Sequence, residues 1–224
     1  MEVTKSLICL ALIFSISACS NTPELETGEI KTLQLLKEAL FEQNNEKTFV
    51  DARMLLSRQQ IDAANIPVLF VELESGQNGT LTPYPGQGIG QTWIGADGAT
   101  LTLDQGILKA SRGMGDDIMS SVSNIHPWAK ITNSSDYSKK LNYLSGNNKI
   151  LTRNFECRIK KMNGKTMLVI WDVAFKVRQY SENCSSQKKT VRNIYFVDAQ
   201  NIVRQSRQYH SETLGFVITQ RLER

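Results

Sequence analysis

The sequence predicts a mainly β protein, an antiparallel β-sandwich or barrel-like domain preceded by one or two N-terminal helices. From residue 67 onward, apolar residues recur with a period of two, which is typical of strands with one buried face. The dipeptides Asp97-Gly98 and Asn163-Gly164 interrupt these runs, and both favour two-residue hairpin turns. About nine or ten short strands with close turns indicate a sandwich or a barrel.

Two helices are expected before the strands. Residues 30–46 have helical periodicity, with one apolar face formed by Ile30, Leu33, Leu36, Leu40 and Phe41. Ser57-Arg58-Gln59-Gln60 has the form of a capping box, so a second, short helix is expected to begin after Ser57 and to end before Pro67.

The strands follow in chain order. The segment Asp116 to Lys149 is the least regular, and residues 133–138 are polar and loop-like. The long run from Lys165 to Tyr180 is expected to bend or to be covered on both faces in its middle. The remaining strands are predicted over Pro67–Glu74, within a three-stranded meander from Trp93 to Arg112, over Ile150–Lys161, and over Val191–Val197, Ile202–His210 and Phe216–Leu222.

The first eighteen residues read as a bacterial lipoprotein signal peptide. Lys5 supplies a positive charge, Leu7 to Phe14 is apolar, and Ile16-Ser17-Ala18-Cys19 has the form of a lipobox that is cut before Cys19. The apolar run is shorter than the roughly 20 residues that span a bilayer as a helix. The alternative is an ordinary secretory signal with an incidental cysteine.

Lipidation predicts the location of the mature protein. Acyl chains such as palmitate on Cys19 would hold it to a bilayer, provided that more than one chain is attached. Ser20 and Asn21 follow, rather than the Asp that retains enterobacterial lipoproteins in the inner membrane. We therefore expect an outer-membrane lipoprotein that faces the periplasm. Residues 19–29 form the lipidated cysteine and a flexible tether, and residues 30–224 form a single mainly β domain.

Two cysteines remain in the mature domain, Cys157 and Cys184. In an oxidising compartment such a pair favours a disulfide, which stabilises a protein by about 3 kcal/mol for a loop of this size. The alternative is two buried thiols. Neither His126 nor His210 is close in sequence, so no metal site is expected there.

The charge balance is mildly basic, with 26 Lys and Arg against 22 Asp and Glu. There is no long basic run, so nucleic acid is not an expected partner. Weak attraction to anionic lipid or acidic polysaccharide remains compatible with this charge.

No catalytic constellation is recognisable, and no cofactor is expected. Asp116 and Asp117 are adjacent, so on a strand they would point to opposite faces. A G-x-S-x-G elbow is absent, and no helix pattern follows the glycine-rich run 86–90. An enzyme would have to bring distant groups together in the fold, from Asp104, Asp116, Asp117, Asp172 and His126.

Three tryptophans, Trp93, Trp128 and Trp171, are candidate contacts for a glycan or a partner, because sugar rings pack on flat apolar surfaces. Arg112 is a candidate partner for an acidic sugar. The alternative for each is a role in packing.

Several runs of this chain resemble the YjbF/GfcB family of lipoproteins. They are Trp93 to Leu103, Gly106 to Asp117, Arg192 to Asp198, Ile202 to Tyr209 and Gly215-Phe216. The resemblance implies a mainly β fold and a periplasm-facing outer-membrane lipoprotein of exopolysaccharide or group-four capsule secretion systems. It implies no catalytic residues.

The function predicted from these observations is that of a non-catalytic accessory factor in secretion or assembly of a surface polysaccharide. Its expected partners are the bilayer, through acylated Cys19, and an outer-membrane polysaccharide-export barrel or the glycan. Two alternatives stay open: a periplasmic enzyme that modifies the polysaccharide, and a structural envelope lipoprotein.

Overall fold

The computed structural model describes residues 51–224 except 87, 89, 126, 145–148 and 188. The predicted signal peptide, the tether, the helix over 30–46 and His126 therefore lie outside the described residues. Within the described part of the chain, no helix is long and apolar enough to cross a membrane.

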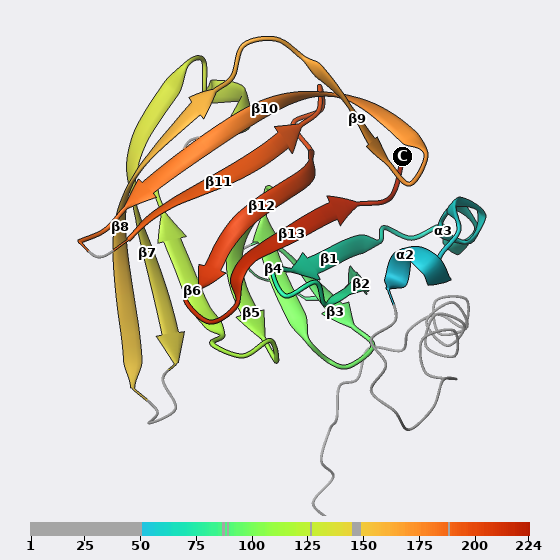
Figure 1. Cartoon of the computed structure of the whole chain (residues 1–224), viewed down its shortest axis with the longest axis horizontal. Helices are drawn as coiled ribbons and strands as arrows, with labels where there is room; N and C mark the ends of the chain where they lie inside the picture. Colours follow the sequence, from blue (N-terminus) through green and yellow to red (C-terminus); the bar gives the residue numbers. More distant parts are fainter. Residues whose placement is uncertain (1–50, 87, 89, 126, 145–148, 188) are drawn as a thin grey trace, which may run out of the picture.

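Thirteen antiparallel strands dominate the structure (Figure 1). Their neighbour order is β5-β4-β3-β2-β1-β13-β12-β11-β10-β8-β7-β6, and β9 pairs with β10 outside this path. The strands are β1 (Leu69–Leu73), β2 (Asn78–Pro83), β3 (Gln91–Gly95), β4 (Thr100–Asp104), β5 (Ile107–Arg112), β6 (Ile118–Ser123), β7 (Ser134–Leu144), β8 (Ile150–Lys161), β9 (Thr166–Ile170), β10 (Val173–Ser185), β11 (Thr190–Val197), β12 (Val203–Ser211) and β13 (Gly215–Arg221).

The sheet curls into a nearly closed barrel, which confirms the predicted mainly β fold. Its two terminal strands, β5 and β6, are joined through side chains. The Arg112 guanidinium donates to the backbone oxygens of Ser111 (2.5 Å) and Ile118 (2.8 Å), and the Ser111 hydroxyl accepts from the Ile118 amide (2.9 Å). These bonds satisfy backbone groups that an open edge would leave unpaired.

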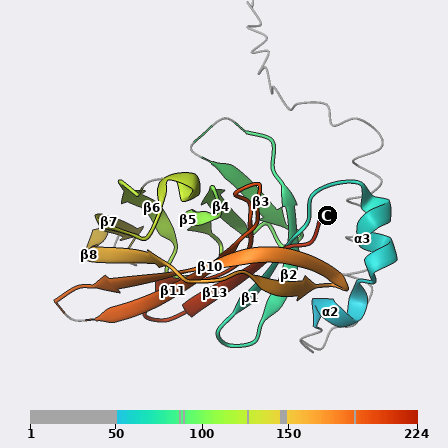
Figure 2. The same cartoon turned by 90° about the horizontal axis from the view of Figure 1, so that it is seen from above.

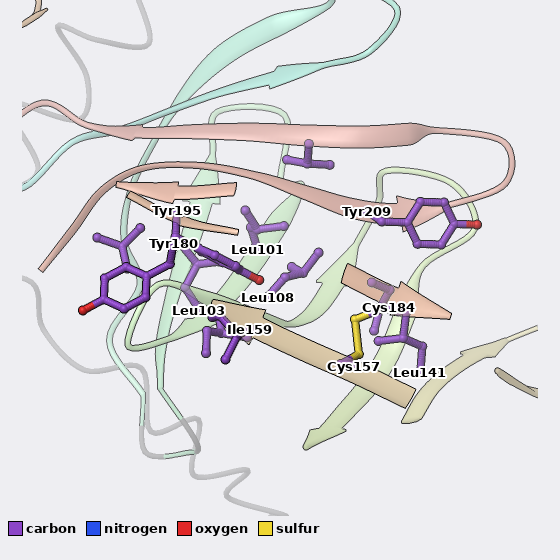
Figure 3. Close-up of a cluster of buried hydrophobic side chains, with 14 of the residues drawn as sticks. Leu101, Leu103, Leu108, Leu141, Cys157, Ile159, Tyr180, Cys184, Tyr195 and Tyr209 are labelled. Carbon is purple, nitrogen blue, oxygen red and sulfur yellow. A yellow bond between two sulfur atoms is a disulfide. The ribbon is translucent and has the colours of Figure 1, made fainter. Parts of the chain in front are cut away.

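Buried and exposed side chains alternate along the strands, and the buried ones fill the barrel. Along β11, for example, Val191, Asn193, Tyr195 and Val197 are buried. Successive side chains of a strand point to opposite faces, so these four share the inner face. Figure 3 shows part of the resulting core, with side chains from strands on both sides of the barrel.

One end of the barrel, here called the Trp128 end, is plugged. The connection between β6 and β7 contains a short 3-10 helix, Trp128–Lys130, and the Trp128 side chain is only 2% exposed. Its ring packs 5.1 Å from Tyr180 and 5.0 Å from Tyr195, and its indole N–H donates to the Gln105 backbone oxygen (2.8 Å). The connection β4–β5 also lies here, where Gln105 and Gly106 both have positive φ, as a tight hairpin turn requires.

The opposite end, here called the Tyr209 end, is formed by the connections β1–β2, β3–β4, β5–β6, β10–β11 and β12–β13. The antiparallel register brings them together: Leu73 pairs with Val217, Ser211 with Gly215, and Ser185 with Thr190. This end is hollowed by open cavities, which are described below.

A second, smaller core lies outside the barrel. Helices α2 (Ala52–Leu55) and α3 (Arg58–Ala64) cover Phe70, on the side of the sheet away from β7 and β8 (Figure 2). The turn between β9 and β10 reaches this core: the Trp171 ring packs edge-on 5.0 Å from Phe70, and its N–H donates to the Leu56 backbone oxygen (3.1 Å). The predicted capping box at Ser57 is present.

The structure corrects several local predictions. The run 133–138 is not a loop but the start of β7. Asn163-Gly164 is not a hairpin turn, because β8 and β9 do not pair with each other; both pair with the same strand, β10. The hairpin turn lies at Trp171-Asp172, where both residues have positive φ, and it divides the predicted long strand in two. The predicted hairpin between β3 and β4 is present, but its loop has three residues and not two. The Gly95 amide donates to the Ala99 backbone oxygen, and of the loop residues 96–98 only Gly98 has positive φ.

The predicted disulfide is also confirmed. Cys157 on β8 and Cys184 on β10 are direct cross-strand partners, and their sulfur atoms are bonded (Figure 3). The bond is buried on the inner face of the barrel. It therefore fixes the register of β8 against β10 covalently.

Replacing both cysteines, as in Cys157→Ser/Cys184→Ser, is expected to lower the free energy of unfolding by about 3 kcal/mol, because the open loop gains chain entropy in the unfolded state. Guanidinium unfolding of the purified mature protein measures this. When a thiol reductant is added, the free energy of unfolding of the native protein should fall to that of the double variant. The free energy of unfolding of the variant should not change. Equal stability of the oxidised native protein and the variant would contradict the prediction.

Candidate functional site

The barrel interior contains a buried carboxylate, Glu182 on β10, which is 0% exposed. The ammonium of Lys139 lies 3.4 Å from both carboxylate oxygens, the Tyr195 hydroxyl donates to one of them (3.0 Å), and the Asn193 amide donates to the same oxygen. The partners come from β7 and β11, so the carboxylate links three strands.

A second buried amide, Gln208 on β12, extends this network. Its oxygen accepts from the Leu108 amide (2.9 Å), and its nitrogen donates to the Gly106 backbone oxygen and to the Ser206 hydroxyl (both 2.8 Å). Ser206 in turn shares a hydrogen bond with Thr219 on β13 (2.7 Å). The side-chain amide of Gln208 is thus satisfied by groups from several strands and turns, which is the condition for burying it.

Burial governs the charges in this network. Desolvation raises the pKa of Glu182 to about 7, although the hydrogen bonds from Asn193 and Tyr195 act in the opposite direction. Desolvation lowers the pKa of Lys139 to about 8, and the nearby Lys109 charge lowers it further. The pair has no access to solvent, so we interpret it as a structural link between strands and not as a reacting pair.

Glu182 also lies close to the disulfide. One carboxylate oxygen and the sulfurs of Cys157 and Cys184 all lie within 4.8 Å of one another. Cysteine binds metals as a thiolate, and both sulfurs here are joined to each other, so neither is available as a ligand.

A serine, a histidine and an aspartate meet near the closure of the barrel. His210 Nε2 lies 2.8 Å from the Ser111 hydroxyl, which lies 3.3 Å from a carboxylate oxygen of Asp117. The order differs from that of a catalytic triad, because the carboxylate contacts the serine and not the histidine. Ser111 and His210 are fully buried, so the hydroxyl cannot meet a substrate. Burial lowers the pKa of His210 to about 4, which keeps the ring neutral.

The other carboxylates named from the sequence have local roles. Asp117 accepts hydrogen bonds from the amides of Gly113 (2.7 Å) and Met114 (3.1 Å) and so holds the β5–β6 turn. Asp172 forms the β9–β10 turn, and Asp104 lies 3.9 Å from the Lys109 ammonium. The three lie on different connections or strands.

The structure does not bring the four candidate glycan contacts together. Trp128 plugs the barrel, and Trp171 packs in the outer core. Arg112 is exposed at the junction of β5 and β6. Trp93 lies inside the barrel, 2% exposed, with its ring 5.4 Å from the Arg221 guanidinium carbon. The sequence did not show that Trp93 and Arg221 come together.

Two adjoining cavities of about 290 and 280 Å³ open at the Tyr209 end. They share Arg153, Tyr209 and Glu212, and together they are called the Tyr209 groove. The other residues each line one of the two cavities: Asp116, Tyr143, Leu144, Leu151, Thr152, Asn154, Phe155, Ser186, Gln187, Lys189, Ser211 and Thr213.

Tyr209 forms the aromatic part of this groove. Its ring contacts Phe155 and Phe216 edge-on, at 6.2 and 5.8 Å, and the Lys189 ammonium lies 4.7 Å from the ring centre. In Figure 3 the Tyr209 hydroxyl points away from the buried cluster. Arg153 and Glu212 form an ion pair beside it at 3.3 Å.

The groove offers one aromatic ring, charged groups of both signs, and several hydroxyl and amide side chains. A sugar hydroxyl donates and accepts at once, so it can bind between a guanidinium and a carboxylate. The mixture of signs does not favour a highly charged ligand of either sign. The geometry suits a hydroxyl-rich chain that lies along the rim.

The comparison with protein families gives one decisive match. The family described as group 4 capsule polysaccharide lipoprotein GfcB, YjbF matches residues 33–222. The chain belongs to this family. The match confirms the resemblance found in the sequence, and it includes every strand of the barrel.

This member of the YjbF/GfcB family also shares its fold with a solved structure. The hypothetical lipoprotein YmcC from Escherichia coli (K12) superposes with a TM-score of 0.66 at 19% identity, over 81% of this chain and 98% of that one. At this identity the likeness shows the fold alone. No curated protein matches the chain.

Sequence reasoning did not find the Tyr209 groove. Its shared residues come from β8, β12 and the β12–β13 turn, and more than fifty positions separate Arg153 from Tyr209. The one available signal was that Tyr209 lies in a run already matched to the YjbF/GfcB family.

The buried His210 predicts a pH dependence of stability. Its pKa is lowered in the folded state, so below its ordinary value near 6.5 the unfolded chain binds a proton that the folded protein does not. The folded state should therefore lose about 3 kcal/mol from this residue as the pH falls from 7 to 4. Denaturant unfolding at several pH values measures it.

The variant His210→Gln is the control, because its amide is neutral throughout. As the pH falls from 7 to 4, the free energy of unfolding of the native protein should decrease by about 3 kcal/mol more than that of the variant, since only the native chain has this histidine. Parallel stability curves from pH 7 to pH 4 would contradict the assignment.

Proposed function

We propose that this lipoprotein is a non-catalytic accessory factor in secretion or assembly of capsule or exopolysaccharide, held to the outer membrane and facing the periplasm. The observation on which the proposal depends is the family match over residues 33–222 in a chain whose first nineteen residues end in a lipobox cysteine. The partner is the glycan or an outer-membrane export barrel.

The described residues support a binding role in preference to catalysis. The serine and histidine that come together, Ser111 and His210, are buried, and Glu182 is enclosed by its partners. The Tyr209 groove, in contrast, is open and presents side chains of mixed polarity. Rigid strands hold it on two sides, which suits recognition of an extended chain.

The lipid anchor is tested with a deletion strain complemented by the native chain or by Cys19→Ala. The native chain should restore surface polysaccharide, whereas the unlipidated variant should fold but restore little, because it is free to diffuse in the periplasm. Surface polymer is measured by uronic-acid or total-sugar assay on washed cells. Full restoration by a soluble Cys19→Ala protein would contradict the role of the anchor.

Normal polymer in the deletion strain itself would contradict the export function. It would shift the interpretation to a structural envelope lipoprotein.

The Tyr209 groove is tested with Arg153→Gln, which removes the charge that pairs with Glu212. Arg153 lies on the same face of β8 as the buried Phe155 and Cys157. If the groove binds glycan, the variant should lower the amount of surface polymer severalfold. The matched control is Arg158→Gln on the same strand. Arg158 faces outward and pairs with Asp136 at 2.6 Å in an exposed ion pair, so its loss should have little effect.

Equal polymer levels in the two variants would remove the groove from the proposal. Both proteins should show native circular dichroism and thermal unfolding, so that loss of polymer is not loss of fold.

A further inference from the structure

The strand β9 has a free edge. It continues the line of β8 along one side of β10, because β8 pairs with Tyr180–Ser185 and β9 pairs with Val173–Val177. The ladder between β7 and β8 ends at Ser134 and Lys160, so β7 does not reach β9. Within the part of the chain that the structure describes, β10 is the only strand that pairs with β9. The outer edge of β9 therefore presents backbone N–H and C=O groups that another strand can bind.

This edge lacks the features that protect exposed strands in natural sheets, which are charged side chains, proline and bulges. The five residues of β9, Thr166–Ile170, include no charge and no proline. The barrel treats its other terminal strands differently, because Arg112 and Ser111 join β5 to β6 through hydrogen bonds. The edge of β9 is thus suited to the addition of a strand from another chain.

The outward face of β9 is apolar as well. Met167 is 60% exposed and Val169 is 64% exposed, whereas Leu168 and Ile170 face the outer core. Successive side chains of a strand point to opposite faces, so Met167 and Val169 lie on one face, two positions apart. Large apolar side chains beside an unpaired edge mark an interaction surface.

We propose that β9 pairs antiparallel with β9 of a second copy of this chain, which makes a two-fold symmetric dimer of barrels. The strand is complementary to itself when the pairing is centred on Leu168. Met167 then lies opposite the partner's Val169, and by symmetry Val169 lies opposite the partner's Met167. Each exposed side chain gains an apolar cross-strand neighbour, which is the unit that stabilises a sheet.

The charges that flank β9 favour the antiparallel direction. Lys165 precedes the strand, Asp172 lies in the turn that follows it, and both are exposed. Antiparallel pairing places Lys165 opposite the partner's Trp171, beside the partner's Asp172, so opposite charges meet at both ends. Parallel pairing would instead bring the two Lys165 charges together, which is unfavourable.

The interface is small, because five residues from each copy form its centre. It falls below the roughly 1,200–2,000 Å² of stable complexes, so we expect a dissociation constant in the micromolar range.

The register is tested by cross-linking the purified mature lipoprotein in detergent. The single variants Met167→Cys and Val169→Cys are mixed and oxidised, and the products are identified by peptide mass spectrometry. The main product should link one variant to the other, and either variant alone should cross-link severalfold less. The native cysteines do not interfere, because Cys157 and Cys184 are bonded to each other.

The strength of the dimer is tested by sedimentation equilibrium over a concentration series. Val169→Lys should raise the dissociation constant at least about tenfold, because the symmetric interface would contain two added charges. Val122→Lys is the matched control: Val122 is 61% exposed on β6, and its replacement should leave the dissociation constant unchanged. Met167→Lys replaces Val169→Lys should that variant fail to fold.

A native protein that is monomeric at every concentration would overturn the proposal. Equal weakening by Val169→Lys and Val122→Lys would also overturn it, because the association would then arise elsewhere, for example in the detergent micelle. A loss of thermal stability in a monomeric Val169→Lys protein would mean that a segment of the same chain, such as residues 30–46, covers β9. None of these outcomes bears on the polysaccharide assays, so the proposed function is tested separately.

Discussion

The rest of the barrel depends on how the Glu182 carboxylate is held in its interior. An unpaired charge in that position would cost several kcal/mol, so Lys139, Asn193 and Tyr195 must reach it from their own strands. A one-residue slip of β10 would turn the carboxylate outward and leave the Lys139 charge buried without its partner. The network therefore specifies one register for β7, β10 and β11.

Two further devices lie on the same face of β10, on either side of Glu182. Tyr180, two positions before it, receives the Trp128 plug, and Cys184, two positions after it, forms the disulfide to β8. Because side chains two positions apart share a face of a strand, Tyr180, Glu182 and Cys184 place an aromatic contact, an ion pair and a disulfide side by side within five residues of β10. Because these groups occupy the interior, the barrel is a packed core that is plugged at the Trp128 end.

The sequence was most informative where local chemistry alone decides the structure. The Asp97-Gly98 hairpin, the capping box at Ser57 and the pairing of Cys157 with Cys184 all follow from short-range patterns or from the cysteine count. The prediction of a loop over residues 133–138 was wrong because the outward-facing residues at the start of β7 are polar. An inward-facing position further along the strand is also polar, since it is occupied by Lys139. Its burial is acceptable only because it pairs with Glu182. The contact of Ser111 with His210 spans 99 positions, and the Tyr209 groove likewise joins distant strands, so neither has a local signal.

The Tyr209 groove lies at one end of an interior that a glycan cannot cross. Its two adjoining cavities follow the rim and can hold several sugar units. If the tether spans residues 19–29, it reaches roughly 20 Å as a flexible chain and about 38 Å when fully extended. A lipid-anchored barrel of this kind would stay beside the membrane with its Tyr209 end free to engage a chain along its length. That role requires binding alone, which agrees with an interior whose serine, histidine and carboxylate are all sealed from solvent.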